Sequence, residues 1–343
     1  MPYDTKKEIL ALGAMDPELK ALLEAHPPPP MKFTTMQALR EDVKDRTLQA
    51  IEALGPPPSS VKQTDITYET IDGTELRARL YQPTSPSDNG SPLIVMYHGG
   101  GFCLGIPESE EKACRDFVRA FNAVCVSPAY RLAPEFPFPQ GPKDAWDALR
   151  WAAESASSWG ADLSRGFIVG GTSAGGNLAC VVTHLARDEG LTPPLTGHYL
   201  CIAGLVPPSR MPDRYKNWAH SYEQNKMDPI NGQAVIDVFT AAYKPDLDDG
   251  VYNGPLIHPN GRAGLPPAFL QVDGADTLRD DSLIYERILR EEHGIETRMV
   301  VYPGLPHAHW AFFPTLKASA KFWQDQLEGM GWLLERTPAT AKV

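Results

Sequence analysis

The chain has 343 residues, of which 42% are hydrophobic and 22% charged, and its formal net charge is −11. This composition indicates a globular protein rather than a disordered or fibrous one, with enough length for one large α/β domain with insertions or two ordinary domains. An acidic chain with a pI of about 5.3 repels a phosphate backbone, which argues against nucleic acid and anionic membrane surfaces as partners.

No stretch approaches the roughly 18 consecutive apolar residues of a membrane-spanning helix, so we expect a soluble protein with no integral membrane segment. The first ten residues, MPYDTKKEIL, mix charges of both signs with no apolar core behind them, and they predict no secretory signal. The five cysteines make an odd count without a CxxC spacing. This pattern indicates reduced, buried thiols, a cytoplasmic location and no structural zinc.

Proline runs at residues 27–30 and 56–58 enclose the first long helical pattern, from Phe33 to Leu54. The apolar residues of this segment recur at roughly helical spacing, namely Met36, Leu39, Val43, Leu48 and Ile51. We therefore expect residues 1–60 to form helices outside the main fold.

The pattern changes to strands at Asp65. DITYET and ELRARLYQP, separated by Asp72-Gly73, predict an antiparallel hairpin, because Asp-Gly readily forms a tight two-residue turn. Short apolar runs then alternate with amphipathic helices, which is typical of a mostly parallel sheet with crossover helices. The predicted strands are residues 93–97, 123–127, 166–170, 198–203, 268–272 and 296–302. The predicted helices are residues 109–121, 143–157, 175–189, 280–292 and 314–327. Between them, residues 205–262 break the alternation and predict an insertion that covers one face of the sheet.

The motif GTSAG at residues 171–175 directly follows a predicted strand and precedes a predicted helix. In this context G-x-S-x-G is typical of a sharp strand-to-helix turn that holds a serine in a strained backbone conformation with its hydroxyl exposed. The free N–H groups at the start of the following helix favour an anion at the same place. A purely structural glycine turn is the alternative, but the flanking strand and helix favour a nucleophile at Ser173.

A second motif, HGGGF at residues 98–102, follows the apolar run LIVMY. Three consecutive glycines leave backbone N–H groups open to a substrate carbonyl with no Cβ in the way, as in an oxyanion hole. A flexible glycine loop and a phosphate cradle are the alternatives, but neither a Lys-Ser/Thr pair nor a GxGxxG spacing is present. The two motifs together predict acyl transfer at a serine.

With these motifs the chain resembles the α/β-hydrolase superfamily, and within it the hormone-sensitive-lipase-like carboxylesterases of fungi and bacteria. The motifs that carry the resemblance are RARLYQP (77–83), HGGGF (98–102), YRLAPEFPFPQGPKD (130–144), GTSAGGN (171–177), DTLRD (276–280) and YPGLPH (302–307). The resemblance implies an α/β fold, with a mostly parallel central sheet flanked by helices, formed by residues 61–204 and 263–343. It also implies a helical cap, formed by N-terminal residues 1–60 and the insertion 205–262.

A serine of this kind needs an acid and a base later in the chain, in the order Ser, Asp or Glu, His. Of the nine histidines, His307 and His309 follow the last predicted strand, whereas the others lie earlier in loops, helices, strands or the insertion. His307 matches the family's catalytic histidine in its PGxxH context, so the resemblance assigns it as the base. Relatives usually carry an aromatic residue at the position of His309, for which we expect a pocket-lining or surface role.

The loop after the predicted strand at 268–272 offers four candidate acids, Asp273, Asp276, Asp280 and Asp281. The family motif DTLRD places the acid at Asp276, and Asp273 is the alternative. We expect the other two to lie at the start of the next helix, where a carboxylate caps free N–H groups.

These assignments imply a serine carboxylesterase, free of cofactor and metal, whose partner is a small or medium uncharged ester. His307 removes the proton of Ser173 as the hydroxyl attacks the ester carbonyl, and Asp276 orients the imidazole. The oxyanion is received by backbone N–H groups of Gly100, Gly101 and Ala174.

Candidate substrate-binding residues are the aromatics Phe102, Trp218 and Tyr222, and further aromatics of the insertion could line the same pocket, namely Tyr215, Phe239 and Tyr243. Aromatics at the spacing found in the insertion more often form simple core. No sequence context marks Cys103 as activated, so we expect it to be a small apolar wall of the pocket. Charged residues of the segment 130–144 are expected to hold loops together, namely Arg131, Glu135 and Asp144.

Other classes on the same fold are an acyltransferase that excludes water, a lyase without the nucleophilic serine, and a non-catalytic small-molecule receptor with an incomplete triad. The presence of Ser173, Asp276 and His307 argues against the lyase and the receptor. No motif fixes the natural substrate or the oligomeric state.

Overall fold

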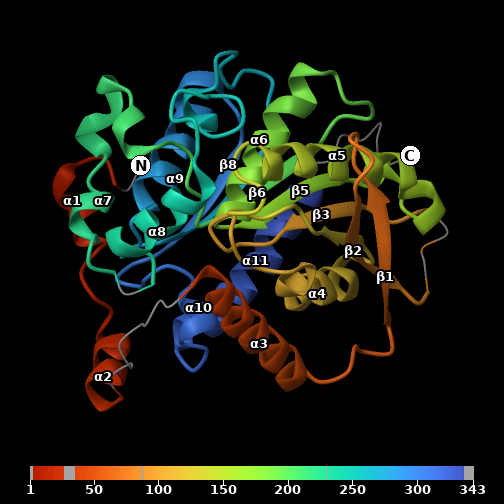
Figure 1. Ribbon diagram of the computed structural model, residues 1–343, viewed down its shortest axis with the longest axis horizontal. Coiled ribbons are helices and arrows are strands. Elements are labelled where there is room, and N and C mark those ends of the chain that lie inside the picture. Colours follow the sequence, from red (N-terminus) through yellow and green to blue (C-terminus); the bar gives the residue numbers. More distant parts are fainter. Residues whose placement is uncertain (1–2, 27–34, 86, 88, 229, 336–343) are drawn as a thin grey trace.

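Figure 1 shows a computed structural model of the chain, which describes residues 3–26, 35–85, 87, 89–228 and 230–335. Its centre is an eight-stranded sheet in the order β1-β2-β4-β3-β5-β6-β7-β8. The strands are β1 (Val61–Glu69), β2 (Glu75–Pro83), β3 (Leu93–Tyr97), β4 (Val124–Pro128), β5 (Phe167–Thr172), β6 (Gly197–Cys201), β7 (Ala268–Asp273) and β8 (Thr297–Tyr302). β2 pairs antiparallel with β1 and β4, and all other neighbours are parallel. The predicted hairpin and mostly parallel sheet are confirmed.

The helices of the described residues are α1 (Lys6–Ala11), α2 (Pro17–Ala25), α3 (Met36–Leu54), α4 (Glu111–Phe121), α5 (Gln140–Ser155), α6 (Ala174–Asp188), α7 (Ser221–Gln224), α8 (Gln233–Tyr243), α9 (Arg279–Arg287), α10 (His309–Phe312) and α11 (Lys317–Glu335). Short 3₁₀ segments lie at Pro107–Glu110, Ala156–Trp159, Leu163–Arg165, Pro208–Arg210, Asp213–Trp218 and Pro255–Ile257.

Helices cover both faces of the sheet, which explains why its central strands are continuous apolar runs rather than alternating ones. Every residue of β3, LIVMY, is buried. On one face α5, α6 and α9 contribute to one hydrophobic core, and on the other face α4 and α11 contribute to a second (Figure 1). The two cores hold the strands rigidly, so the loops at the carboxyl ends of the strands start from fixed points.

Several helices differ from their predicted ranges at the ends. The helix predicted at 314–327 continues as α11 to Glu335, because Met330 and Leu333 extend its apolar side and are fully buried. The helix predicted at 280–292 is α-helical only as far as Arg287 and then forms a π-helical turn over Ile288–Glu292.

The N-terminal segment is attached to the core more closely than helices outside the main fold would be. Ile9, Leu12 and Leu19 are buried. The carbonyl oxygen of Leu12 accepts a hydrogen bond from the N–H of Gly304 at 2.7 Å, and the Gly304 carbonyl accepts one from Asp16 at 3.1 Å. The segment therefore packs behind the loop that follows β8, and apolar burial drives this attachment.

The predicted helix at 33–54 is observed as α3, and its first predicted residues, 33 and 34, lie outside the described part of the chain. Arg40 joins α3 to the loops that contain Cys103 and Ala133. Its guanidinium donates to the carbonyl oxygens of Cys103, at 2.6 Å, and Ala133, and it forms an ion pair with Glu135 at 2.6 Å. Apolar residues of the same helix pack on a small aromatic cluster that contains Phe102, Phe239 and Tyr243.

The segment 130–144 is held by a buried ion pair, as expected from its charged residues. Arg131 donates to both carboxylate oxygens of Asp144, at 2.6 and 2.9 Å, and Asp144 has no exposed side-chain surface. Arg131 also reaches Asp72 in the hairpin turn at 2.8 Å. Arg131 and Asp144 thus join the hairpin turn to the segment 130–144. These contacts agree with the structural role predicted for Arg131 and Asp144.

The insertion 205–262 does not simply cover one face of the sheet. Its ends join the core on the α6 face, through buried Leu205, Val206 and Leu256. Its middle, with α7 and α8, lies instead at the carboxyl edge of the strands, where Phe239 contacts the HGGGF loop.

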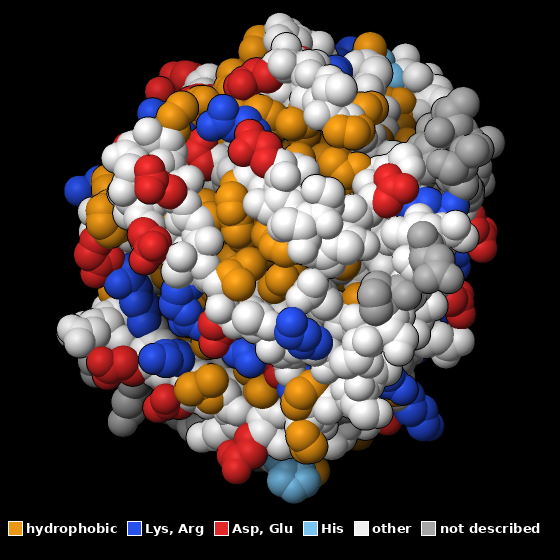
Figure 2. Space-filling model, turned by 90° about the vertical axis from the view of Figure 1, so that its right-hand side faces the viewer, with side chains coloured by type: hydrophobic (Ala, Val, Ile, Leu, Met, Phe, Trp, Pro, Cys, Tyr) orange, Lys and Arg blue, Asp and Glu red, His pale blue; other side chains and the backbone are white. Residues whose placement is uncertain are grey.

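Positive and negative side chains are interspersed on the face at the β1 side of the sheet (Figure 2). Arg77 of β2 illustrates the pattern, because its guanidinium lies 2.5 Å from the carboxylate of Glu108 and 3.8 Å from that of Asp65. Pairing of this kind leaves no strong field of one sign on the face shown.

His198 lies fully buried in β6, between Val169 and Ala268 of the neighbouring strands. Burial lowers the pKa of its imidazole from the ordinary value of 6.5 to about 4. Below pH 6.5 the His198 imidazole therefore binds a proton in the unfolded chain but stays neutral in the folded one. As a result, the free energy of unfolding falls as the pH drops from about 6.5 towards 4.

We predict that His198→Phe removes this proton linkage. The free energy of unfolding of the variant, relative to the wild type, is expected to rise by up to about 1.4 kcal/mol per pH unit as the pH falls through that window. Urea denaturation at pH 7, 6, 5 and 4.5 measures the difference. A difference between the two proteins that is the same at every pH would contradict the prediction.

Candidate active site

Ser173 occupies the sharp turn between β5 and α6. Its φ is 56° and its ψ −115°, a conformation that side-chain-bearing residues rarely adopt. The glycines around it are required by space, because a Cβ on Gly175 would lie 2.0 Å from the Tyr97 carbonyl oxygen. A Cβ on Gly171 would lie 2.3 Å from the carbonyl oxygen of Gly175. The close packing of α6 against β3 and β5 therefore explains both glycines of G-x-S-x-G.

A continuous chain of hydrogen bonds joins the three residues of the predicted triad. Nε2 of His307 lies 2.9 Å from Oγ of Ser173, and Nδ1 lies 2.7 Å from Oδ2 of Asp276. The His307 side chain is 10% exposed and the Asp276 side chain 1%, so the hydrogen-bond chain runs from the surface of the site into the protein. With Nδ1–H donated to the carboxylate, Nε2 is free to accept the serine hydroxyl proton.

The electrostatic surroundings of His307 favour its protonated form. Burial by itself lowers the pKa of the imidazole, but the facing Asp276 carboxylate and the more distant Asp228 and Asp273 outweigh that effect and raise the pKa above 6.5. An imidazolium that forms at this place is therefore stabilised by nearby negative charge.

Asp276 and His307 stand on two loops that leave neighbouring strands at the same edge. Asp276 follows β7, and His307 follows β8. The loops are joined by backbone hydrogen bonds from Gly274 to the Tyr302 carbonyl at 2.8 Å and from Ala275 to the Leu305 carbonyl at 2.9 Å. The remaining oxygen of Asp276 accepts the N–H of Leu278 at 3.0 Å, which fixes the carboxylate plane.

The alternative acid Asp273 is paired with the second histidine. Nδ1 of His309 lies 2.8 Å from Oδ1 of Asp273, and neither side chain has exposed surface. His309 is therefore a buried residue, which differs from the pocket-lining or surface role expected for it. The expected role is wrong because the polar partner lies inside the protein, at the end of β7.

Asp280 and Asp281 do not cap their own helix as expected. Asp280 accepts backbone N–H groups of His220 at 2.5 Å and Ser221 at 2.7 Å, and Asp281 accepts those of Leu205 and Val206 at 2.9 and 3.2 Å. Tertiary contacts replace the local cap, since both carboxylates are buried against the insertion.

The HGGGF loop lies beside the serine. A Cβ on Gly99 would be 2.9 Å from the Thr172 carbonyl oxygen and 3.4 Å from Cβ of Ser173. Gly100 and Gly101 have positive φ values of 120° and 58°, which glycine adopts without strain. Within the described part of the chain, neither of their N–H groups donates to a backbone carbonyl.

The three candidate substrate-binding aromatics fall in different places. Phe102 belongs to the aromatic cluster on which α3 packs, and it stacks on Tyr243 with ring centroids 4.1 Å apart. Tyr222 lies among the acid-loop carboxylates, where burial and their negative charge raise the pKa of its hydroxyl.

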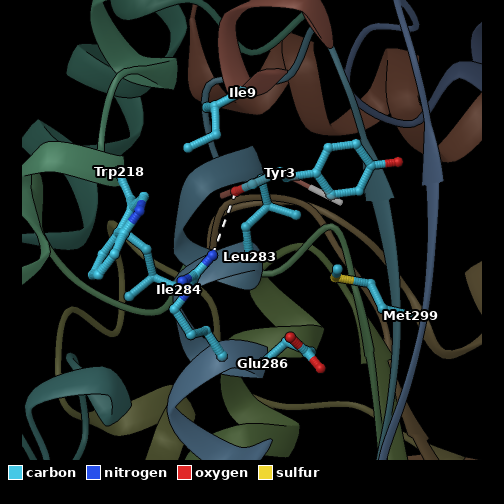
Figure 3. Close-up of a pocket in the computed structure, with 8 residues that line it drawn as sticks. Tyr3, Ile9, Trp218, Leu283, Ile284, Glu286 and Met299 are labelled. Carbon is cyan, nitrogen blue, oxygen red and sulfur yellow. Dashed lines mark hydrogen bonds between the residues drawn. The ribbon is translucent and has the colours of Figure 1, made fainter. Parts of the chain in front are cut away.

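Trp218 lies away from the serine, in a contact between the insertion, the N-terminal segment and α9. It lines a separate cavity with Tyr3, Ile9, Leu283, Ile284, Glu286, Arg287 and Met299 (Figure 3). The cavity volume of about 10 Å³ is room for about one water molecule. Trp218 also donates to the Asp4 carbonyl and lies 4.5 Å from the Arg287 guanidinium, so its contacts fasten the N-terminal segment.

The insertion contributes polar groups to the site that sequence reasoning missed. Asn225 donates to the Asp276 carbonyl at 2.8 Å, and Asn231 lies 3.4 Å from Oδ1 of the same residue. Asp228 accepts the backbone N–H of His307 at 3.4 Å, and burial raises its pKa from 3.8 to about 6. These residues belong to a turn-rich stretch without periodicity, so no sequence signal marks them as part of the site.

Cys103, which follows the HGGGF motif directly, is not an activated thiol. Burial raises the pKa of the Cys103 thiol to about 12, so the thiol remains protonated. It lies in the aromatic cluster on which α3 packs.

In the part of the chain that the structure describes, no group of three or more His, Cys, Asp and Glu side chains is arranged to hold a metal ion. No helix within the same residues is long and apolar enough to cross a membrane.

Comparisons with known proteins agree with this fold. A family model described as an alpha/beta hydrolase fold matches residues 94–311. An AB hydrolase superfamily protein of Schizosaccharomyces pombe is 37% identical over 93% of this chain and 94% of its own length. Carboxylesterase NlhH of Mycobacterium tuberculosis is 35% identical over 90% and 92%.

Solved structures of similar proteins have the same fold. A vibralactone cyclase superimposes with a TM-score of 0.88 at 34% identity, covering 96% of this chain and 97% of that one. An esterase of Pyrobaculum calidifontis superimposes with a TM-score of 0.79 at 28% identity, covering 94% and 98%.

The sheet order, the serine turn and the two carboxyl-edge loops define the α/β-hydrolase class. The chain belongs to this family, in its hormone-sensitive-lipase-like branch, as the sequence motifs predicted.

We predict that Gly175→Ala destabilises the protein, because the added methyl group meets a backbone carbonyl that cannot move away. A loss of roughly 1–3 kcal/mol in the free energy of unfolding is expected. Gly141→Ala in α5 is the matched control, since a Cβ there has its nearest atoms at 3.4 Å and should leave stability unchanged or slightly higher. Urea denaturation of both variants measures the effect, and equal stabilities would argue against the steric explanation of the motif.

Proposed function

We propose that this chain is a serine carboxylesterase that hydrolyses small to medium uncharged carboxylic esters through an acyl-enzyme intermediate. The observation that carries the proposal is the unbroken hydrogen-bond chain from Ser173 through His307 to Asp276. At the level of class, the chain is a carboxylic ester hydrolase, in keeping with relatives named carboxylesterase and esterase.

In the first half of the reaction Ser173 Oγ attacks the ester carbonyl while Nε2 of His307 takes the hydroxyl proton. The C–O bond to the alcohol then breaks, and the alcohol leaves with the proton that His307 returns. Asp276 keeps Nδ1 protonated and balances the charge of the imidazolium.

In the second half a water molecule attacks the acyl-Ser173 ester. His307 accepts a proton from the water and delivers it to Ser173 Oγ as the carboxylic acid departs. The nucleophile, base and acid all come from the chain itself, so the proposed reaction uses no cofactor.

We assign the oxyanion hole to the N–H groups of Gly100, Gly101 and Ala174. Gly99 lies against the serine turn, and Ala174 is the first residue of α6, whose N-terminus favours negative charge. Loss of one such donor typically costs about 10²–10³ in rate.

We also propose that residues 1–60 and 205–262 form the cap and that the core consists of residues 61–204 and 263–343. The support is the aromatic cluster between α3, α8 and the HGGGF loop, which contains Phe102, Phe239 and Tyr243. Its apolar character suits an uncharged substrate. The five cysteines are unpaired and buried, in keeping with the cytoplasmic location that we propose.

A second candidate function is acyl transfer to a hydroxyl group of the substrate itself. It is favoured by the likeness to a protein named vibralactone cyclase, at 34% identity over nearly the whole chain. In that reaction the substrate hydroxyl replaces water: its oxygen attacks the acyl-Ser173 ester, His307 takes its proton and returns it to Ser173 Oγ, and a cyclic ester leaves. The lyase and receptor alternatives have less support, because Ser173, His307 and Asp276 are joined by hydrogen bonds.

The direct test is hydrolysis of short-chain p-nitrophenyl esters by the purified protein. Wild-type protein is expected to hydrolyse them and to react with a fluorophosphonate at Ser173, and Ser173→Ala should abolish both. Asp276→Asn should lower kcat by roughly 10⁴, because the imidazole loses its orientation and charge balance. Wild-type protein that neither hydrolyses esters nor takes up the label would overturn the proposal. Mass spectrometry of the products with hydroxy-ester substrates separates hydrolysis from cyclisation.

We further predict that Phe239 limits the size of the acyl group. A Cβ on Gly101 would lie 2.6 Å from its ring, so the ring closes the space directly beside the proposed oxyanion hole. Phe239→Ala should raise kcat/KM for octanoate relative to acetate esters by at least about tenfold. Val238→Ala is the matched control, because Val238 is 38% exposed on the same helix and should leave the ratio unchanged. An unaltered ratio in the Phe239 variant would show that the pocket lies elsewhere.

A further inference from the structure

The loops of the site are joined by a second Asp–His pair that the mechanism above does not use. Asp273 Oδ1 lies 2.8 Å from Nδ1 of His309, and Asp273 Oδ2 accepts the backbone N–H of His309 at 3.4 Å. Both side chains are completely buried. The arrangement repeats the contact between His307 and Asp276, which joins the same two loops at 2.7 Å.

Stability alone does not account for this pair. Removing two polar groups from water costs free energy, and an apolar pair of the same volume would serve the core as well or better. The surroundings are already aromatic, with Tyr302, Trp310 and Phe322 placed with ring centroids 5.1 to 5.8 Å from His309. Within the described residues Nε2 of His309 has no hydrogen-bond partner, a further cost of keeping an imidazole there.

The position of the pair suggests what it contributes. Asp273 is the last residue of β7, so its carboxylate stands on the rigid end of the sheet. Backbone hydrogen bonds tie the His307 loop to the acid loop only as far as Leu305. Beyond that point the chain turns through Ala308, whose φ of 57° is strained, before His309 begins α10. The bonds to Asp273 are thus the next attachment of this loop to the end of the sheet, two residues after His307.

We propose that the buried Asp273–His309 pair is a positioning device that holds the loop of His307 at a fixed distance from Ser173. The inference depends on the proposed esterase function, since it assigns a task to His309 within that reaction. His309 touches no substrate in this account and acts only through His307. Misplacement of a reacting group by about 1 Å costs on the order of 10²-fold in rate, so a second attachment of this loop has a large effect on turnover.

The experiment compares three variants by kcat, KM and melting temperature. His309→Phe keeps the ring volume and removes the bond to Asp273; kcat is expected to fall roughly tenfold to hundredfold with KM within about twofold. His309→Asn keeps a donor near the position of Nδ1 and should recover most of kcat. His309→Phe leaves the buried Asp273 carboxylate without its partner, so its melting temperature should also fall. The double variant Asp273→Ala with His309→Phe contains no unpaired carboxylate. Its melting temperature should therefore return towards the wild-type value, while its kcat remains low.

The double variant separates positioning from stability. If kcat returns together with the melting temperature, the pair is only structural and the proposal is wrong. Unchanged kcat in His309→Phe would also overturn it. If His309→Phe does not fold, the double variant and His309→Asn still decide the question. His184→Phe is the matched control, because it removes a buried imidazole hydrogen bond, 3.2 Å to Tyr285, away from the two loops. It should lower the melting temperature and leave kcat within about twofold.

The same measurements separate this proposal from the proposed function. Wild-type protein that lacks esterase activity and fluorophosphonate labelling would contradict the function itself. Active wild-type protein with an unaffected His309→Phe variant would contradict only the positioning role.

Discussion

The close approach of α6 to the sheet is the constraint on which the site depends. Gly175 lies so near the Tyr97 carbonyl that no side chain fits between the helix and β3. This contact forces the chain to turn sharply at Ser173, with φ at 56°, and places the serine hydroxyl at the carboxyl edge of the strands. It also fixes the glycine loop after β3, because Gly99 packs against the Thr172 carbonyl. The proposed nucleophile and oxyanion donors thus stand on one rigid unit, and the loops of Asp276 and His307 reach that unit from β7 and β8, which lie beyond β6 in the sheet.

Negative charge around His307 is the second constraint. Asp276 binds the imidazole directly, Asp228 accepts its backbone N–H, and Asp273 is linked to the same loop through His309. Burying three carboxylates together is unfavourable, and the pKa of Asp228, raised to about 6 by burial and by the charge of Asp276, reflects that cost. The same charge raises the pKa of His307, which favours the imidazolium that the proposed reaction creates. The arrangement therefore destabilises the folded state but raises the pKa of His307, as the proposed role of a general base requires.

Sequence predicted those parts of the fold and site that depend on local chemistry. Hydrophobic runs and the Asp-Gly turn predicted the sheet, and the glycines around Ser173 followed from the space that a strand-to-helix turn leaves. The choice of Asp276 and His307 among the candidate acids and bases came from the family motifs. Contacts made across the fold were not predictable in this way: Asp281 was expected to cap its own helix, yet it binds backbone of the insertion, because buried carboxylates take whichever free N–H groups the tertiary structure presents. Asp228 was missed since nothing in a turn-rich segment indicates which loop it will face.

The insertion contains two stretches that are attached in different ways, and this difference bears on how specificity can change. Residues 221–228, 230 and 231 are held to the loops of Asp276 and His307 by polar contacts, among them Asn225 with the Asp276 carbonyl and Asp228 with the His307 N–H. α8 instead meets the HGGGF loop through aromatic packing, with Phe239 beside Gly101. Substitutions that conserve volume are tolerated in apolar contacts, whereas loss of one partner of a buried hydrogen bond leaves the other unsatisfied. The side of α8 that faces the HGGGF loop can therefore vary in size without moving Ser173, His307 and Asp276. The polar residues that contact the loops of Asp276 and His307, such as Asn225 and Asp228, cannot vary freely, because they support those loops.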